Sequence, residues 1–112
     1  MTTPKIKLVQ GDTGPDIDFT LTDEETGAVI PVDDPGDVVR MYFRKVGATT
    51  LTATITLTKP NGGADGNVRI VWPVGVLADA GEYEGENEIT FESGKVQTVY
   101  DKLRFTVRAQ VG

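Results

Sequence analysis

The chain has 112 residues, a formal net charge of −6, and neither histidine nor cysteine. That length suits one domain around a single core, and the two missing residue types exclude disulfides, thiol or imidazole catalysis and the common zinc and haem sites. The acidic balance and the scattered Lys and Arg residues disfavour nucleic acid, and no apolar run suits a membrane helix or secretory signal, so we expect a product made in the cytoplasm.

Apolar and polar residues alternate with a period of two, which predicts about seven β-strands. In the second strand Ile17 and Phe19 face one side while Asp18 and Thr20 face the other. A short extended piece at 28–32 contains a proline, which cannot donate to a ladder and therefore belongs at a sheet edge. The predicted strands are residues 5–9, 16–23, 38–45, 51–58, 68–72, 82–91 and 96–107, the last with a break near Asp101.

Turn signals separate these strands at intervals of about 8–12 residues. Residues 59–66 are the strongest turn cluster and are expected to form a mobile tip, and residues 33–37 are a loop by composition. Only 74–79 has a pattern that allows a short helical turn. The chain is therefore predicted to be a single all-β domain over 1–112, an antiparallel two-sheet sandwich with an ordered core at about 5–109.

Asp79, Gly81 and Tyr83 have the Asp-x-Gly-x-Tyr spacing of a tyrosine corner, in which the hydroxyl bonds back to the preceding turn. The alternative is an ordinary core tyrosine that follows a turn. The cysteine usual two residues later in immunoglobulin domains is replaced by Gly85, so apolar packing must hold the core, with Trp72 as its largest candidate member. The predicted fold is an immunoglobulin-like sandwich.

Four glutamates alternate along the penultimate strand. Paired carboxylates catalyse glycoside hydrolysis and bind hard cations. Residues two apart on a strand, however, lie roughly 6–7 Å apart on an open face, which disfavours both kinds of site. In this strand order the row lies between the strand that bears Arg40 and Arg44 and the last strand, which bears Lys102 with two arginines. We interpret it as a structural charge ladder, with a partner-binding face as the alternative. The predicted ladder comprises Arg40, Arg44, Glu82, Glu84, Glu86, Glu88, Arg104 and Arg108.

Two further motifs have the look of sites. Aspartates at 33, 34 and 37, with others at 12, 16 and 18, suggest calcium, but they lack the spacing of an EF-hand loop, and aspartate is common in turns. Residues 12–14 are Asp-Thr-Gly, as in an aspartic protease, but those enzymes need a second copy and none exists here. We therefore predict no catalytic residue, no metal site and no cofactor.

Five motifs follow one another along the chain: QGDTGP at 10–15, DFTLTDEETGAVIPV at 18–32, VVRMYFRK at 38–45, GNVRIVW at 66–72 and DAGEYEGENEITFESGK at 79–95. In this order and spacing they resemble the immunoglobulin-like domain of tailed-phage structural proteins, in particular the N-terminal domain of siphophage baseplate upper proteins. The resemblance runs from about Ile6 to Val107, nearly the whole chain.

The resemblance implies a bacteriophage virion structural protein, located in the virion after assembly in the host cytoplasm. Such a module packs on neighbouring tail, baseplate or capsid proteins in symmetric multiple copies and anchors or decorates the particle. Its partners are other virion proteins, with no nucleic acid, membrane or small-molecule substrate. Baseplate proteins continue into further domains whereas this chain ends at Gly112, which leaves head decoration, fibre attachment and a tail adaptor open.

Two alternatives stay open. A host-surface or carbohydrate-binding module of the same fold would need an aromatic platform, for which Tyr42 and Tyr100 are available. An acid-based enzyme would need two carboxylates in a cleft. Partner contacts are expected in loops at the sandwich poles, which vary most freely, although acidic loops also block edge pairing. The expected contact residues are Asp33, Asp34, Asp37, Asn61, Gly62 and Asp65.

Overall fold

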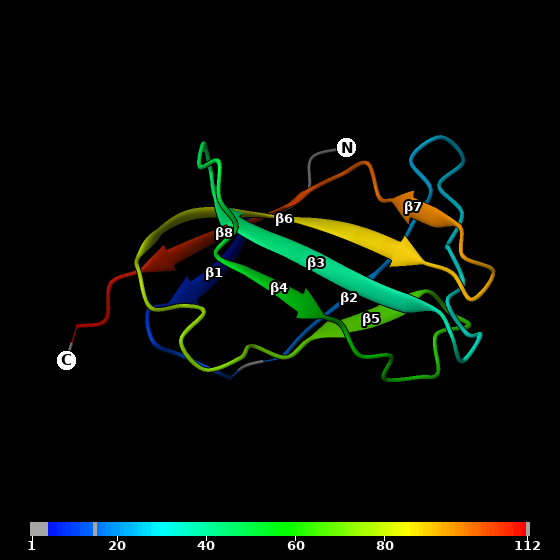
Figure 1. Cartoon of the computed structure of the whole chain (residues 1–112). Helices are drawn as coiled ribbons and strands as arrows, with labels where there is room; N and C mark the ends of the chain where they lie inside the picture. The colour runs from blue at the N-terminus through cyan, green and yellow to red at the C-terminus, as the bar shows by residue number, and fades with distance from the viewer. Residues whose placement is uncertain (1–4, 15, 112) are drawn as a thin grey trace.

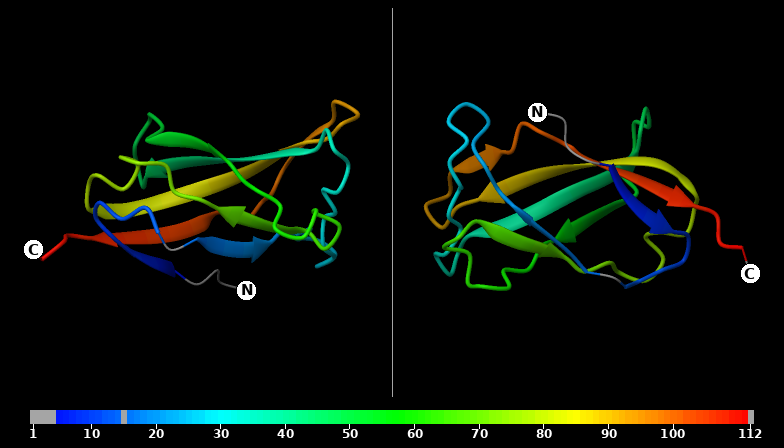
Figure 2. Two further views of the ribbon diagram at one scale, coloured as in Figure 1. Left: turned by 90° about the horizontal axis from the view of Figure 1, so that it is seen from below. Right: turned by 180° about the vertical axis from the view of Figure 1, so that it is seen from behind.

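The computed structural model describes residues 5–14 and 16–111, which form two β-sheets packed face to face (Figures 1 and 2). The described residues contain no helix, and the predicted all-β sandwich is confirmed. In that part of the chain no helix is long and apolar enough to cross a membrane. The strands are β1 (Lys5–Val9), β2 (Ile17–Thr20), β3 (Val38–Lys45), β4 (Ala53–Thr56), β5 (Asn67–Ile70), β6 (Gly81–Thr90), β7 (Val96–Thr98) and β8 (Leu103–Arg108).

The six-stranded sheet has the order β1-β8-β6-β3-β4, with β3 and β6 as its long central strands (Figure 1). β1 runs parallel to β8, whereas the other neighbours are antiparallel. β7 pairs with the C-terminal part of β6 and β8 pairs with its N-terminal part. They are two halves of one interrupted strand, which agrees with the break expected near Asp101.

The chain changes sheets after β4. The N–H of Leu57 still donates to the carbonyl of Val39 in the six-stranded sheet, at 2.8 Å. The next residue, Thr58, instead exchanges backbone hydrogen bonds with Arg69, which lies on β5 of the two-stranded sheet formed by β2 and β5. The predicted strand at 51–58 is therefore shared between two sheets, because its alternation continues while its pairing partner changes.

The piece at 28–32 lies at the edge of the two-stranded sheet, where the N–H of Ile30 donates to the carbonyl of Leu21 at 2.9 Å. It also holds the tip at 59–66, because the N–H of Val32 donates to the carbonyl of Gly63 at 2.9 Å. Gly63 has φ +95°, and a Cβ there would lie 2.5 Å from the Val32 carbonyl oxygen. The residues expected to form a mobile tip are thus anchored to the edge piece.

Four aromatic rings form the centre of the core between the sheets. Phe43 stacks on Tyr83 with ring centroids 4.7 Å apart, and it meets Trp72 and Phe105 edge-on at 5.3 Å each. All four side chains are buried. Stacked and edge-on arrangements suit the charge distribution of aromatic rings. Trp72 thus lies in the core, as expected.

The segment expected to form a helical turn at 74–79 is not helical. Gly75 has φ +88°, which lies outside the right-handed helical region. Leu77 is buried, and its carbonyl accepts the N–H of Gly11 at 2.7 Å. The segment therefore forms an irregular cover over the end of the core instead of a helix.

The hydroxyl of Tyr83 donates to the carbonyl oxygen of Asp79 at 2.7 Å, which is the bond that defines a tyrosine corner. Burial, together with the nearby charge of Asp79, raises the pKa of Tyr83 above its usual value. Gly81, with φ +149°, starts β6 between them. The three residues thus fix the connection that leads into the central strand.

Replacing Tyr83 with phenylalanine is expected to lower the free energy of unfolding by about 1 kcal/mol, because one hydrogen bond is lost while the stacked ring remains. Urea unfolding followed by Trp72 fluorescence measures the change. Tyr42→Phe is the matched control, since it removes a tyrosine hydroxyl outside the corner. An unchanged unfolding midpoint for Tyr83→Phe would mean that the hydrogen bond does not pin this connection.

Candidate functional site

The outer face of the six-stranded sheet, which is turned away from the two-stranded sheet, gathers most of the basic side chains. Seven of the eleven Lys and Arg residues and four glutamates lie on this face, which gives it a net charge of +3. The other four basic and thirteen acidic residues give the rest of the chain a net charge of −9. Residues scattered along the sequence meet here because every second residue of neighbouring strands shares one face. The members are Lys5, Lys7, Arg40, Arg44, Lys102, Arg104 and Arg108, with Glu82, Glu84, Glu86 and Glu88.

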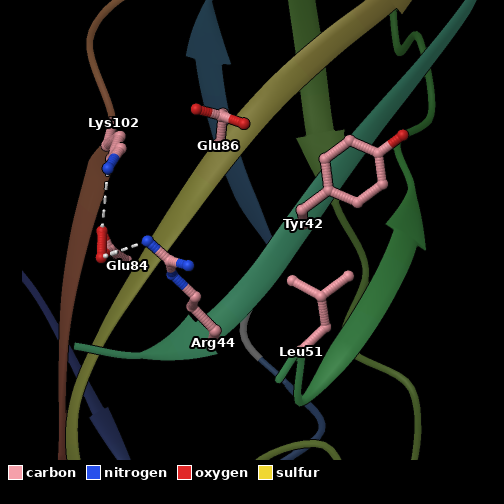
Figure 3. Close-up of a pocket in the computed structure, with 6 residues that line it drawn as sticks. All are labelled: Tyr42, Arg44, Leu51, Glu84, Glu86 and Lys102. Carbon is pink, nitrogen blue, oxygen red and sulfur yellow. Dashed lines mark hydrogen bonds and ion pairs between the residues drawn. The ribbon is translucent and has the colours of Figure 1, made fainter. Parts of the chain in front are cut away.

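A hollow of about 270 Å³, which we call the central hollow, lies on this face (Figure 3). Its lining combines two bulky side chains with a group of charged ones. Leu51 is half exposed and contributes an apolar wall before β4 begins. The lining residues are Tyr42, Arg44, Leu51, Glu84, Glu86 and Lys102.

Glu84 is only 6% exposed although it belongs to the outer face. Arg44 Nη2 lies 3.4 Å from its Oε1, and Lys102 Nζ lies 3.3 Å from its Oε2 (Figure 3). Burial by itself raises the pKa of Glu84, but the hydrogen bond from Lys102 and the charges of Lys102, Arg44 and Arg104 outweigh it, so this pKa lies below its usual value. A carboxylate held ionised between two cations is poorly suited to act as a general acid.

Replacing Glu84 with glutamine is expected to lower the free energy of unfolding by about 1 kcal/mol at pH 7, because Arg44 and Lys102 lose a partner but remain open to water. A lowered pKa stabilises the fold above the pKa of the unfolded chain, and this contribution is lost as the pH falls through the folded value. The difference from the parent should therefore shrink below the usual pKa of 4.5. Urea unfolding from pH 7 to pH 3 measures it.

The control for this series is Glu86→Gln, which removes a carboxylate from the same strand and face. Glu86 is in none of the ion pairs found among the described residues. We expect this variant to follow the parent more closely across the pH range. Equal losses from both variants would show that the net charge of the face, and not the pairing of Glu84, sets the stability.

Tyr42 is tethered to the sheet by its hydroxyl, which donates to Glu88 Oε1 at 2.8 Å. That hydrogen bond, together with burial, raises the pKa of Tyr42. Arg40 lies opposite Glu88 in the ladder, but the Glu88 carboxylate accepts its hydrogen bond from Tyr42. Tyr100 is 83% exposed and lines a different hollow, near Glu24. The two tyrosines therefore do not form the aromatic platform that a carbohydrate-binding module would need.

The ion pairs on the face differ from the predicted ladder in the cations they use. Lys102, which was expected on the strand facing the row, contacts Glu84, whereas Lys5, whose Nζ lies 2.7 Å from Glu82 Oε1, was not part of the predicted ladder. Of the predicted arginines only Arg44 forms an ion pair with the row among the described residues. The parallel pairing of β1 with β8 brings Lys5 to this face, and alternation within a strand gives no sign of that pairing.

The strands β1 and β8, together with Lys102 just before β8, form a strip of basic residues, the basic strip, and neither strand contains an acidic side chain. Arg104 and Arg108 form none of the ion pairs found in the described part of the chain, and Arg108 donates to the Ala109 carbonyl at 2.9 Å. A second hollow of about 290 Å³, the strip hollow, opens here. The basic strip comprises Lys5, Lys7, Lys102, Arg104 and Arg108, and the strip hollow is lined by Lys7, Leu8, Val9, Thr106 and Arg108.

The loops expected to contact partners lie at one end of the molecule (Figure 1), where Lys59 Nζ donates to the Asp34 carbonyl at 3.3 Å. Asp37 does not fit this expectation because it is only 5% exposed. Its carboxylate accepts the N–H of Glu92 at 2.8 Å and that of Asp34 at 3.2 Å, so it fastens the loop to the end of β6. The expected contact residues that are exposed are Asp33, Asp34, Asn61, Gly62 and Asp65.

The aspartates considered for calcium have other partners or lie apart. Asp18 receives two hydrogen bonds from the guanidinium of Arg69, at 2.7 and 3.0 Å, and this bonding lowers the pKa of Asp18. Asp37 is used by backbone N–H groups. Within residues 5–14 and 16–111 no group of three or more acidic, histidine or cysteine side chains is placed to hold a metal ion.

No protein-family model and no curated protein matches the chain. Among solved structures, CopC from Methylosinus trichosporium OB3b is similar, with a TM-score of 0.51 and 11% sequence identity over 96% of this chain and 87% of that chain. At this identity the likeness shows the fold alone, and it supports the β-sandwich.

These findings correct the expected biological role. CopC, the similar solved structure described above, is not a phage structural protein. No family model and no curated protein ties the chain to tail, baseplate, fibre or capsid proteins. The prediction of a bacteriophage virion protein that anchors or decorates the particle is therefore wrong.

Proposed function

We propose that the chain is a noncatalytic binding module that receives an acidic segment of another polypeptide on the basic strip. The observation that carries this proposal is the separation of charge on the chain. The outer face of the six-stranded sheet has a net charge of +3, whereas the remaining residues have a net charge of −9. Such a separation orients an approaching acidic partner and fixes where it lands.

The basic strip has cations to offer to a partner. Lys5 is neutralised by Glu82 and Lys102 by Glu84, whereas Lys7, Arg104 and Arg108 form no ion pair among the described residues. All three are exposed. They therefore remain available to carboxylates that come from outside the chain.

The size of the basic strip favours a polypeptide over a nucleic acid. β1 has five residues, and at roughly 3.3 Å per residue it matches a similar number of residues of an extended peptide. A phosphate backbone continues beyond such a short strip, and there it would meet a surface with net −9. A short acidic peptide segment avoids that repulsion.

A copper-binding role does not fit the side chains of this chain. Protein copper sites use imidazole, thiolate and thioether ligands. The sequence has no histidine or cysteine, and of its two methionines Met41 is fully buried in the core. Catalysis is equally disfavoured, because both oxygens of Glu84, the buried carboxylate of the central hollow, are taken by cations.

The test is a titration of the ¹⁵N-labelled chain, followed by NMR, with a ten-residue peptide of alternating glutamate and serine. We expect shifts of the amides at 5–9 and 103–108, and a loss of affinity of about tenfold in Lys7→Glu, since a charge-assisted contact becomes a repulsion. Lys95→Glu is the matched control, because it makes the same charge change at an exposed lysine beyond the far end of β6.

Three outcomes would contradict the proposal. Equal losses in Lys7→Glu and Lys95→Glu would mean that only the net charge matters. A lysine–serine peptide that binds more tightly than the glutamate peptide would reverse the sign of the partner. A single-stranded oligonucleotide that binds the same amides more tightly than the peptide would change the class of partner.

A further inference from the structure

We infer that the acidic segment carries an apolar anchor residue that sits in the strip hollow, two positions from an acidic residue. This inference rests on the proposed function and adds a sequence preference to it. The segment would contain the pattern acidic, any residue, apolar. The partner is thus a polypeptide with an alternating acidic and apolar side, not merely an acidic one.

The strip hollow has the shape and lining for an apolar side chain. Its volume is about 290 Å³, and Val9, which is half-buried, provides an apolar side chain on this face, whereas Leu8 lines the hollow but is itself buried in the core. Lys7 and Arg108 stand at its sides, and long basic side chains can pack their aliphatic stems against an apolar group while their charged ends stay in water. An apolar residue in this position is therefore framed by two cations.

The register of the strands sets the spacing. Lys7 lies beside Thr106, and the next outward position along the strip has Val9 beside Arg108. On β8 the outward-facing residue before Thr106 is Arg104, which forms no ion pair in the described part of the chain. In an extended segment residues i and i+2 point the same way, so an anchor over Val9 places an acidic residue near Lys7 and Arg104.

The other hollows suit such a segment less well. The central hollow contains Glu86, whose carboxylate is in no ion pair found among the described residues. The hollow near Tyr100, of about 600 Å³, is lined by Asp23, Glu24 and Glu25. Both would repel acidic residues beside the anchor. The charged residues that line the strip hollow are the cations Lys7 and Arg108. The nearest carboxylate, that of Glu82 opposite Thr106, is paired with Lys5.

The test compares two peptides, Ser-Glu-Ser-Leu-Ser-Glu-Ser and the same peptide with serine in place of leucine, in NMR titrations of the full chain. We expect the leucine peptide to bind about tenfold more tightly, as expected for a leucine side chain buried in part. Val9→Ser should abolish this preference. Thr106→Val extends the apolar lining and should increase the preference for the leucine peptide about twofold. This second variant keeps the test decisive if Val9→Ser destabilises the fold.

The outcomes separate the inference from the proposed function. Equal affinities of the two peptides, both weakened by Lys7→Glu, would overturn the apolar anchor and leave the acidic-segment module standing. A leucine preference that Val9→Ser and Thr106→Val leave unchanged would place the anchor elsewhere and overturn the inference. Absence of shifts at 5–9 and 103–108 with either peptide would overturn both.

Discussion

Replacing Phe43 with alanine is expected to lower the free energy of unfolding by about 3–5 kcal/mol, the usual cost of removing a buried aromatic ring. Phe43 is fully buried and touches three other rings, Trp72, Tyr83 and Phe105. Its loss leaves a cavity among rigid neighbours that cannot all close in. Urea unfolding at equilibrium, followed by far-UV circular dichroism, measures the change.

The control is Tyr42→Ala, which removes a ring from the neighbouring position on the same strand but from the outer face, where Tyr42 is half-buried. We expect a smaller loss than for Phe43→Ala, because less apolar area returns to water. A loss below about 1.5 kcal/mol for Phe43→Ala would contradict the view that this ring centres the core. It would mean that the surrounding rings repack around the gap.

Much of the fold can be predicted from the sequence because a half-buried strand must alternate. Val39, Met41 and Phe43 are all buried, as their alternation with Arg40 and Tyr42 predicts. Alternation reports which face a residue takes but not which strand lies next to it. The change of sheet after β4 and the parallel pairing of β1 with β8 depend on that second choice, so the pattern of residues does not predict them.

The candidate site can be predicted only in part for the same reason. The glutamate row and Arg44 can be found from their spacing, whereas Lys5 joins Glu82 from 77 residues away. The burial of Asp37 depends on its two backbone partners, one of which, Glu92, is 55 residues distant. The resemblance to phage domains drew on strand and turn patterns that antiparallel sandwiches share. It therefore agreed with the fold but gave a wrong prediction of the biological role.

Gly85→Ala is expected to lower the free energy of unfolding by about 1–3 kcal/mol, the usual cost of overpacking a core. A Cβ at this position would lie 2.6 Å from Met41 Sδ and 3.1 Å from Phe105 Cε1. Both neighbours are fully buried. The glycine thus makes room for the thioether of Met41 and the ring of Phe105.

A double-mutant cycle identifies the cause of that loss. Met41→Val shortens the side chain that the new methyl group would strike, so the pair Gly85→Ala and Met41→Val should be more stable than the sum of the two single changes predicts. The matched control is Gly94→Ala, since a Cβ at that turn meets nothing within 4 Å, although its φ of +93° adds backbone strain. Strict additivity between Gly85→Ala and Met41→Val would show that the crowding lies elsewhere, with Phe105 as the remaining neighbour.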